Sequence, residues 1–216
     1  MPANTPPTTR SDTPSRRGRP RAGEREERER RIVEAALDEL IEHGYEKVTM
    51  LGVARRAGAS KETLYSWFGS KEGLFSALIE ANADQSAERV AEALDSDDAP
   101  IAVLPGHAVG LLTLLTSPGS LALNQAAMSS PALADTLLAS GRHRVGPIVE
   151  RYLAQLGETG RLRIDDPASA FELLYGLVVR DTQIRSLLGE PAPTARAIQK
   201  RADSAVADFV RLSSSR

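Results

Sequence analysis

From residue 24 onwards, the apolar residues of this 216-residue chain recur with the period of an α-helix. The first apolar stripe consists of Ile32, Val33, Ala36, Leu37, Leu40 and Ile41. Gly44 follows the stripe, at the position where a left-handed helix cap is common. The later segments are rich in Ala and Leu, and none shows a convincing alternation of β-branched and polar residues. The sequence therefore predicts an all-α fold.

Composition and charge restrict the class of protein. The chain has no cysteine, which excludes disulfides and thiolate metal sites. There is no signal-peptide pattern, and the longest apolar stretch, residues 108–115, is too short to span a bilayer. We therefore expect a cytoplasmic protein with no membrane partner. The net charge is −2, but residues 1–75 carry +2 and the remainder −4, so a basic surface must arise from arrangement.

Residues 48–69 contain two short helical segments separated by a glycine. Thr49 is an expected N-cap for a helix over residues 50–57, because its hydroxyl can accept from a free backbone N–H. Gly58 permits a tight turn, and Ser60 is the expected N-cap of a second helix over residues 61–68. Two helices joined by a short turn containing Gly match a helix-turn-helix.

The faces of the second helix follow from 100° per residue. Leu64 and Phe68 lie one turn apart and should point into the core, with Trp67 on a flank near them. A recognition helix presents its N-terminal residues to base edges in the major groove of DNA. The exposed candidates here are Lys61, Glu62, Thr63, Tyr65 and Ser66.

Two helices begin with the same triplet, Ser60-Lys61-Glu62 and Ser70-Lys71-Glu72. A lysine in the first turn opposes the helix dipole by about 0.3–1 kcal/mol when exposed. A phosphate at that terminus would reverse the sign, because the free N–H groups and the lysine both favour an anion. The alternative is that Glu62 and Glu72 simply offset the neighbouring lysines.

Residues 24–80 resemble the DNA-binding domain of the tetracycline-repressor (TetR) family. The residues that carry the resemblance are Ile32, Ala35, Ala36, Gly44, Tyr45, Val48, Thr49, Val53, Ala54, Ala57, Gly58, Ser60, Thr63, Leu64, Tyr65, Phe68, Ser70, Lys71, Glu72 and Leu74. The resemblance implies that the helix starting near Ser60 contacts the major groove. It also implies that Thr49, Tyr65 and Lys71 contact phosphate. Leu51 and Trp67 depart from the family pattern, which leaves the operator sequence open.

A basic segment, residues 16–21, precedes the first helix. Its Arg-Gly-Arg-Pro pattern is compact, and arginine side chains fit narrow A·T minor grooves. We therefore add Arg17 and Arg19 to the expected DNA contacts, the alternative being a solubilising tail. The full expected set is Arg17, Arg19, Thr49, Ser60, Lys61, Glu62, Thr63, Tyr65, Ser66, Trp67 and Lys71.

The family resemblance implies that the C-terminal part is a helical domain that binds a ligand and dimerises. The last two helices, expected at 168–188 and 194–212, would pair with their copies in a four-helix bundle. Their apolar faces comprise Phe171, Leu174, Tyr175, Val178 and Ile184, and Ile198, Ala202, Ala205, Val206, Phe209 and Val210. The alternative is that these faces form a core within one chain. A dimer is also favoured because two-fold pairing doubles the base contacts and matches a palindromic operator.

A small-molecule pocket, if present, should be mainly apolar with a few polar groups. The candidate lining residues are Leu104, His107, Leu111, Leu115, Asn124, Met128, Arg144, Tyr152 and Tyr175. No catalytic constellation or phosphate loop is present, and the three histidines lack metal-ligand spacing. The sequence therefore predicts no enzyme, no cofactor and no metal site.

We expect three parts: a disordered basic arm over residues 1–22, a helix-turn-helix domain over 23–80, and a regulatory and dimerisation domain over 81–216. The boundary should lie inside a long helix that starts at Ser70. The leading hypothesis is a homodimeric repressor that a small-molecule effector releases from a palindromic operator. The alternatives are a DNA-binding regulator without a small-molecule ligand and an all-α enzyme or interaction module that only mimics the motif.

Overall fold

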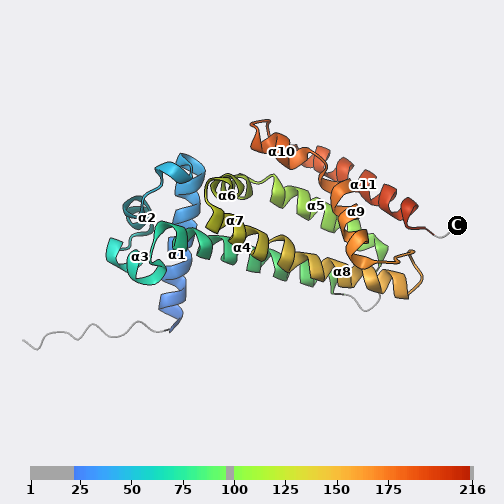
Figure 1. Cartoon of the computed structure of the whole chain (residues 1–216), viewed down its shortest axis with the longest axis horizontal. Coiled ribbons are helices and arrows are strands. Elements are labelled where there is room, and N and C mark those ends of the chain that lie inside the picture. The colour runs from blue at the N-terminus through green and yellow to red at the C-terminus, as the bar shows by residue number, and fades with distance from the viewer. Residues whose placement is uncertain (1–21, 96–99, 215–216) are drawn as a thin grey trace, which may run out of the picture.

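The computed structural model describes residues 22–95 and 100–214, and Figure 1 shows these residues folded into helices joined by turns and loops. The described residues contain no β-strand, which confirms the predicted all-α fold. Helix α1 spans Ala22–His43, so it begins at the last residue of the predicted arm. The prediction of disorder for the rest of that arm lies outside the described residues.

A small N-terminal unit is built from α1 and three short elements. These are the 3₁₀ turn η1 (Tyr45–Lys47), α2 (Met50–Ala57) and α3 (Lys61–Phe68). Gly44 links α1 to η1 at φ 73°, a left-handed conformation that glycine adopts without steric cost. The buried residues of this unit from α1 to α3 are Ile32, Ala35, Ala36, Leu40, Val48, Met50, Val53, Ala54 and Leu64.

Helix α4, Lys71–Leu94, leads from this unit into the rest of the molecule (Figure 1). Its first buried residues, Leu74, Phe75, Leu78 and Ile79, complete the N-terminal core. Leu94, near its other end, belongs to a separate C-terminal core. This arrangement agrees with a boundary inside α4, although residues of α6 and α7 also join the N-terminal core, and the division at residue 80 stays a prediction.

The remaining elements are η2 (Ile101–Val103), α5 (Leu104–Leu115), α6 (Pro118–Ser129), α7 (Pro131–Ser140), α8 (Arg142–Glu158), α9 (Pro167–Val179), α10 (Thr182–Leu187) and α11 (Ala195–Leu212). Three of them start with proline after a capping side chain, from Ser117, Ser130 and Asp166 respectively. Proline suits the first helical position because its missing N–H would have no intrahelical partner.

For the C-terminal helices one prediction was wrong, and for another the alternative of a core within one chain is the one observed. The single helix expected over residues 168–188 is two helices, α9 and α10, because the backbone turns at Arg180 with φ 47° and ψ −127°. The apolar faces assigned to pairing between copies lie largely inside one chain. Buried in the C-terminal core are Phe171, Leu174, Val178, Ile198, Ala202, Ala205, Val206 and Phe209. These buried side chains are therefore not available for contact with a second copy.

Among the described residues, no single helix has the length and apolar character needed to cross a membrane. The pair Ile101–Leu115 and Pro118–Ser129 passes the same test only when taken together, and the two halves meet at a 58° bend.

Candidate nucleic-acid interface

Local capping groups fix the helix-turn-helix. The Thr49 hydroxyl accepts from the Gly52 N–H at 3.0 Å, and the Ser60 hydroxyl accepts from the Thr63 N–H at 3.1 Å. Between the two helices Gly58 adopts the left-handed conformation, with φ 62° and ψ 35°. The predicted caps and turn are therefore confirmed. Each hydroxyl oxygen is used by the fold, so a DNA phosphate would have to share it.

Helix α3 has one buried and one exposed face, close to the predicted arrangement. Leu64 is fully buried, whereas Tyr65 is 46% exposed. Lys61, whose ammonium group lies 5.5 Å from the Tyr65 ring centroid, is exposed with it. Glu62 and Ser66 are exposed as well. Thr63 differs from expectation, since it is half-buried and its hydroxyl lies 3.0 Å from the Ser60 hydroxyl.

Trp67 is half-buried and joins α3 to α1. The Arg25 guanidinium lies over its ring, 5.4 Å from the centroid, and the Phe68 ring packs edge-on at 6.5 Å. A cation over an aromatic face is attracted by the ring quadrupole. Trp67 was included among the expected DNA contacts, and its contacts here are those of a packing residue.

Lys71 is also held by the protein itself. Its ammonium group donates to the Tyr45 carbonyl oxygen at 2.6 Å and lies 4.2 Å from the Tyr45 ring centroid. The same ring packs edge-on against Phe75 at 5.2 Å. Burial, and then the charge of Glu72, raise the pKa of Tyr45. Lys71 therefore anchors the η1 turn to the start of α4, a role that the sequence pattern did not indicate.

Arg56 is a second contact that the sequence analysis missed. From α2 it donates to Glu39 at 2.8 Å and to Glu42 at 2.7 and 2.5 Å, both on α1. These hydrogen bonds raise the pKa of Arg56, and the one from Arg56 lowers the pKa of Glu42. Glu39 and Glu42, three residues apart on α1, were the sequence signal that could have indicated this contact. The neighbouring Arg55 is exposed and adds a basic side chain to α2.

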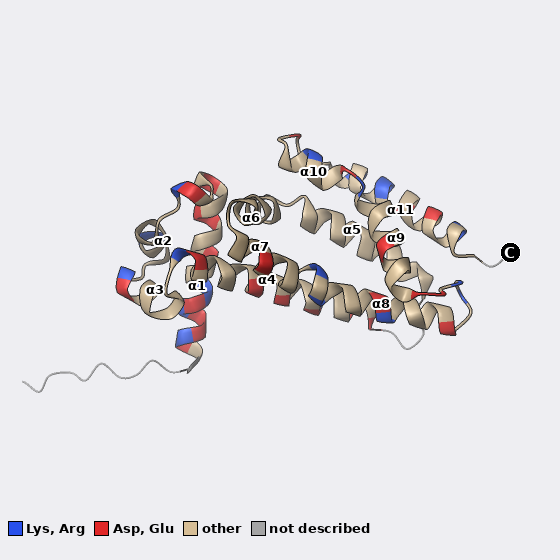
Figure 2. Cartoon of the chain, in the orientation of Figure 1, with Lys and Arg blue, Asp and Glu red and all other residues tan. Residues whose placement is uncertain are grey.

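Charges of both signs surround the motif. Figure 2 shows Lys/Arg and Asp/Glu intermixed along α1, while α5 and α6 carry neither. At the start of α3, a hydrogen bond from its own backbone N–H, and then one from Ser60, lower the pKa of Glu62. The surface is therefore not uniformly basic. The other two expected basic contacts, Arg17 and Arg19, lie outside the described residues.

The residues expected to line a ligand pocket are spread over several environments. Leu104 and Tyr152 are buried, and the Tyr152 hydroxyl donates to the Pro100 carbonyl at 2.6 Å. Met128 is 68% exposed, and Arg144 is exposed in an ion pair with Asp84. The others, which are partly buried, are His107, Leu111, Leu115, Asn124 and Tyr175. Two cavities among the described residues are lined by none of these residues.

Comparison with known protein families matches both halves of the chain. Residues 32–78 match the model of "Bacterial regulatory proteins, tetR family", and residues 102–212 match that of the "AefR-like transcriptional repressor, C-terminal domain". The chain belongs to the TetR family. Membership of this family makes the chain a DNA-binding transcriptional regulator rather than an enzyme, as the helix-turn-helix pattern predicted.

Individual TetR-family relatives agree with this assignment. A TetR regulator from Agrobacterium tumefaciens, of solved structure, is 35% identical with a TM-score of 0.70, over 86% of this chain and 94% of that one. The flavonoid-responsive regulator FrrA is 26% identical with a TM-score of 0.65, over 88% and 99% of the two chains. The uncharacterized regulator YdeS of Bacillus subtilis is 31% identical over 103 residues. The chain spans about half the length of this curated relative, 48% of each being aligned.

Proposed function

We propose that this TetR-family chain is a homodimeric repressor whose α3 helices contact a palindromic operator. The main evidence for this proposal is the exposed face of α3, which is formed by Lys61, Glu62, Tyr65 and Ser66. The helix itself is held in place by its capping groups. Repression is supported by the AefR-like repressor description of the C-terminal match. Two copies are favoured because a helix of eight residues makes few base contacts alone.

Release by a small-molecule effector completes the proposal. The relative FrrA is named as flavonoid-responsive, which supports a sensory role for a similar C-terminal domain here. An effector acts only through a difference in its affinity for two conformations. Helix α4 is the candidate connection, because it contributes buried residues to both cores. The cytoplasm is the proposed location.

Substitution on α3 tests the DNA-binding part. Tyr65→Ala should weaken binding to the DNA upstream of the chain's own gene by about tenfold, because Tyr65 is expected to contact phosphate and a hydrogen bond to a charged group contributes about 1.5–3 kcal/mol. Lys61→Ala should weaken binding to all sequences and reduce the salt dependence, because a lysine contacts phosphate. Fluorescence anisotropy over a salt series measures both effects.

Arg89→Ala is the matched control, since Arg89 is an exposed basic residue in the later part of α4. It should leave affinity and salt dependence unchanged. Wild-type affinity in both α3 variants would contradict the placement of the interface. A metabolite screen by thermal shift addresses the effector separately, since a regulator without a ligand would give no hit but would still bind DNA.

A further inference from the structure

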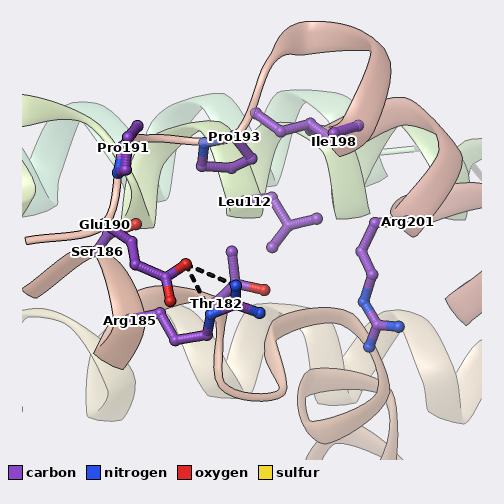
Figure 3. Close-up of a pocket in the computed structure, with 10 residues that line it drawn as sticks. Leu112, Thr182, Arg185, Ser186, Glu190, Pro191, Pro193, Ile198 and Arg201 are labelled. Atoms are coloured by element: carbon purple, nitrogen blue, oxygen red, sulfur yellow. Dashed lines mark hydrogen bonds and ion pairs between the residues drawn. The ribbon is translucent and has the colours of Figure 1, made fainter. Parts of the chain in front are cut away.

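A cavity of about 310 Å³ lies between α5, α10, α11 and the segment that joins the last two (Figure 3). Leu112, Pro193 and Ile198 supply an apolar wall, and Thr182 adds a hydroxyl. None of the residues expected from the sequence to line a pocket belongs to it. Ligand pockets typically measure about 300–1,000 Å³, so this volume suits a small molecule.

Arg201 is the distinctive charged group of this cavity. Its guanidinium donates to the carbonyl oxygens of Val178, at 3.1 Å, and Leu177. Both acceptors are neutral, and within the described chain the guanidinium makes no ion pair with a carboxylate. Arg201 therefore has a positive charge without a direct ion pair at a half-buried position, where an anion would be attracted more strongly than in bulk water. The charges of Arg180, Asp181 and Asp208 also act on it from a longer distance.

The other two charged residues that line the cavity, Arg185 and Glu190, neutralise each other. Arg185 forms hydrogen-bonded ion pairs with Glu190 at 2.6 and 2.8 Å, and Asp181 lies 3.8 Å from the same guanidinium. Figure 3 draws the Arg185–Glu190 pair on one side of Leu112 and Arg201 on the other. An anion in the cavity would thus meet one unpaired cation beside an apolar wall.

We propose that this cavity binds a small organic carboxylate. The carboxylate group contacts the Arg201 guanidinium, whose planar N–H groups suit carboxylate oxygens. A short apolar body packs against Leu112, Pro193 and Ile198.

The position of the cavity connects it to the break between α9 and α10. Arg201 donates to the carbonyls of Leu177 and Val178, in the last turn of α9. Arg180, two residues after Val178, has a backbone conformation that L-residues rarely adopt. Such conformations persist only where their surroundings enforce them. A carboxylate on Arg201 would compete with these carbonyls and shift the end of α9. This effector role rests on the proposed function, whereas binding of the carboxylate does not.

Titration of the full chain with acetate, butanoate, hexanoate and benzoate, and with neutral hexanol, tests the site. We expect hexanoate or benzoate to raise the unfolding temperature saturably and hexanol not to. Arg201→Gln should weaken that binding at least tenfold, while Arg211→Gln, on the same helix and paired with Asp208 at 2.9 Å, should not. Ala197→Phe should abolish binding by filling the cavity, with every polar group retained.

The unfolding temperature of each variant without ligand shows whether the variant is folded. If Arg201→Gln does not fold, Ala197→Phe is the variant that tests the site. Failure of every carboxylate to bind, an equal shift with hexanol, or an equal loss in Arg211→Gln overturns the proposal. Operator affinity measured without a carboxylate tests the proposed DNA-binding function and does not depend on the cavity. A carboxylate that binds through Arg201 without altering operator affinity supports the site and overturns its effector role.

Discussion

The corner between α3 and α4 leaves no room for a side chain at Gly73. A Cβ there would overlap the Phe68 carbonyl oxygen, which itself accepts from the Ser70 N–H at 2.8 Å. At Gly106, in the first turn of α5, a Cβ would meet nothing within 4 Å. The two helical glycines therefore differ. Gly73 is required because the backbone of α3 approaches it closely, whereas a larger residue would fit at Gly106.

Alanine substitution should separate these two glycines. Gly73→Ala should lower the free energy of unfolding by about 1–3 kcal/mol, the usual cost of overpacking. Gly106→Ala should leave it unchanged or raise it by up to about 1 kcal/mol, because alanine is the better helix former. Urea denaturation measures both. Equal effects of the two substitutions would mean that the α3–α4 corner is not as tight as described.

His107 on α5 should make stability depend on pH. Burial lowers the pKa of His107, so on acidification the unfolded chain takes up a proton that the folded chain resists. Stability is therefore unaffected above the unfolded pKa and falls as the pH drops below about 6.5, by at most about 1.4 kcal/mol per pH unit. His107→Gln should remove this part of the dependence between pH 7 and 5.5.

His143→Gln serves as the control, because His143 is exposed. It should leave the slope of unfolding free energy against pH as in the wild type. If His107→Gln retains the full wild-type slope in urea titrations, another group is responsible for the acid sensitivity.

The first turn of α4 contacts both the η1 turn and the turn between α6 and α7. Lys71 donates to the η1 turn, and the adjacent Glu72 accepts from the Ser130 hydroxyl at 3.2 Å. Ser130 is also the N-cap of α7, where it accepts from the Leu133 N–H. A movement of the α6–α7 turn would therefore reach the first turn of α4, next to the helix-turn-helix, through one hydrogen bond.

Ser130→Ala should uncouple these elements. It should cost about 1 kcal/mol of stability as a lost N-cap and weaken operator binding several-fold, because Glu72 loses its partner. Ser117→Ala is matched, since Ser117 caps α6 ahead of a proline and makes its other hydrogen bond within its own turn, to Leu114. It should lose similar stability and keep its affinity. Identical affinities for the two variants, measured by anisotropy, would remove Ser130 from the pathway.

Sequence reasoning succeeded where a single residue carries its own signal. The caps at Thr49 and Ser60 and the turn at Gly58 could be predicted because each satisfies a backbone need within three residues. The break at Arg180 could not, because neither glycine nor proline marks it. The partner of Lys71 could not either, since Tyr45 lies 26 residues away and only the packed fold brings them together.

At the scale of the whole molecule, the two cores are not separated cleanly along the chain. The N-terminal core includes Leu123, Ala126, Ala127 and Leu133 from α6 and α7. Gly119 of α6 faces the Leu37 side chain of α1, where a Cβ would lie 3.3 Å from it. A displacement of α6 would therefore move the Leu37 side chain of α1 directly. This contact is a second way in which the proposed effector would act on the DNA-binding unit.

For the proposed homodimer, the faces of α9 and α11 that lie outside the core are the candidate contact surfaces. Leu173 is 40% exposed on α9, and Gly176 is exposed one turn later. On α11, Ser204 and Ala207 are exposed and small. Because small residues allow two helices to approach closely, we expect these faces to pair across a two-fold axis in the proposed dimer, in place of the apolar faces first expected.

The most direct test of the account is the stoichiometry of the chain on an operator selected from random DNA. Analytical ultracentrifugation and anisotropy should show two chains bound per duplex to a palindrome, with half-sites about one helical turn apart. Replacing one half-site should lower the affinity by at least tenfold. A single chain per duplex, with affinity unchanged when one half-site is replaced, would contradict the dimeric repressor.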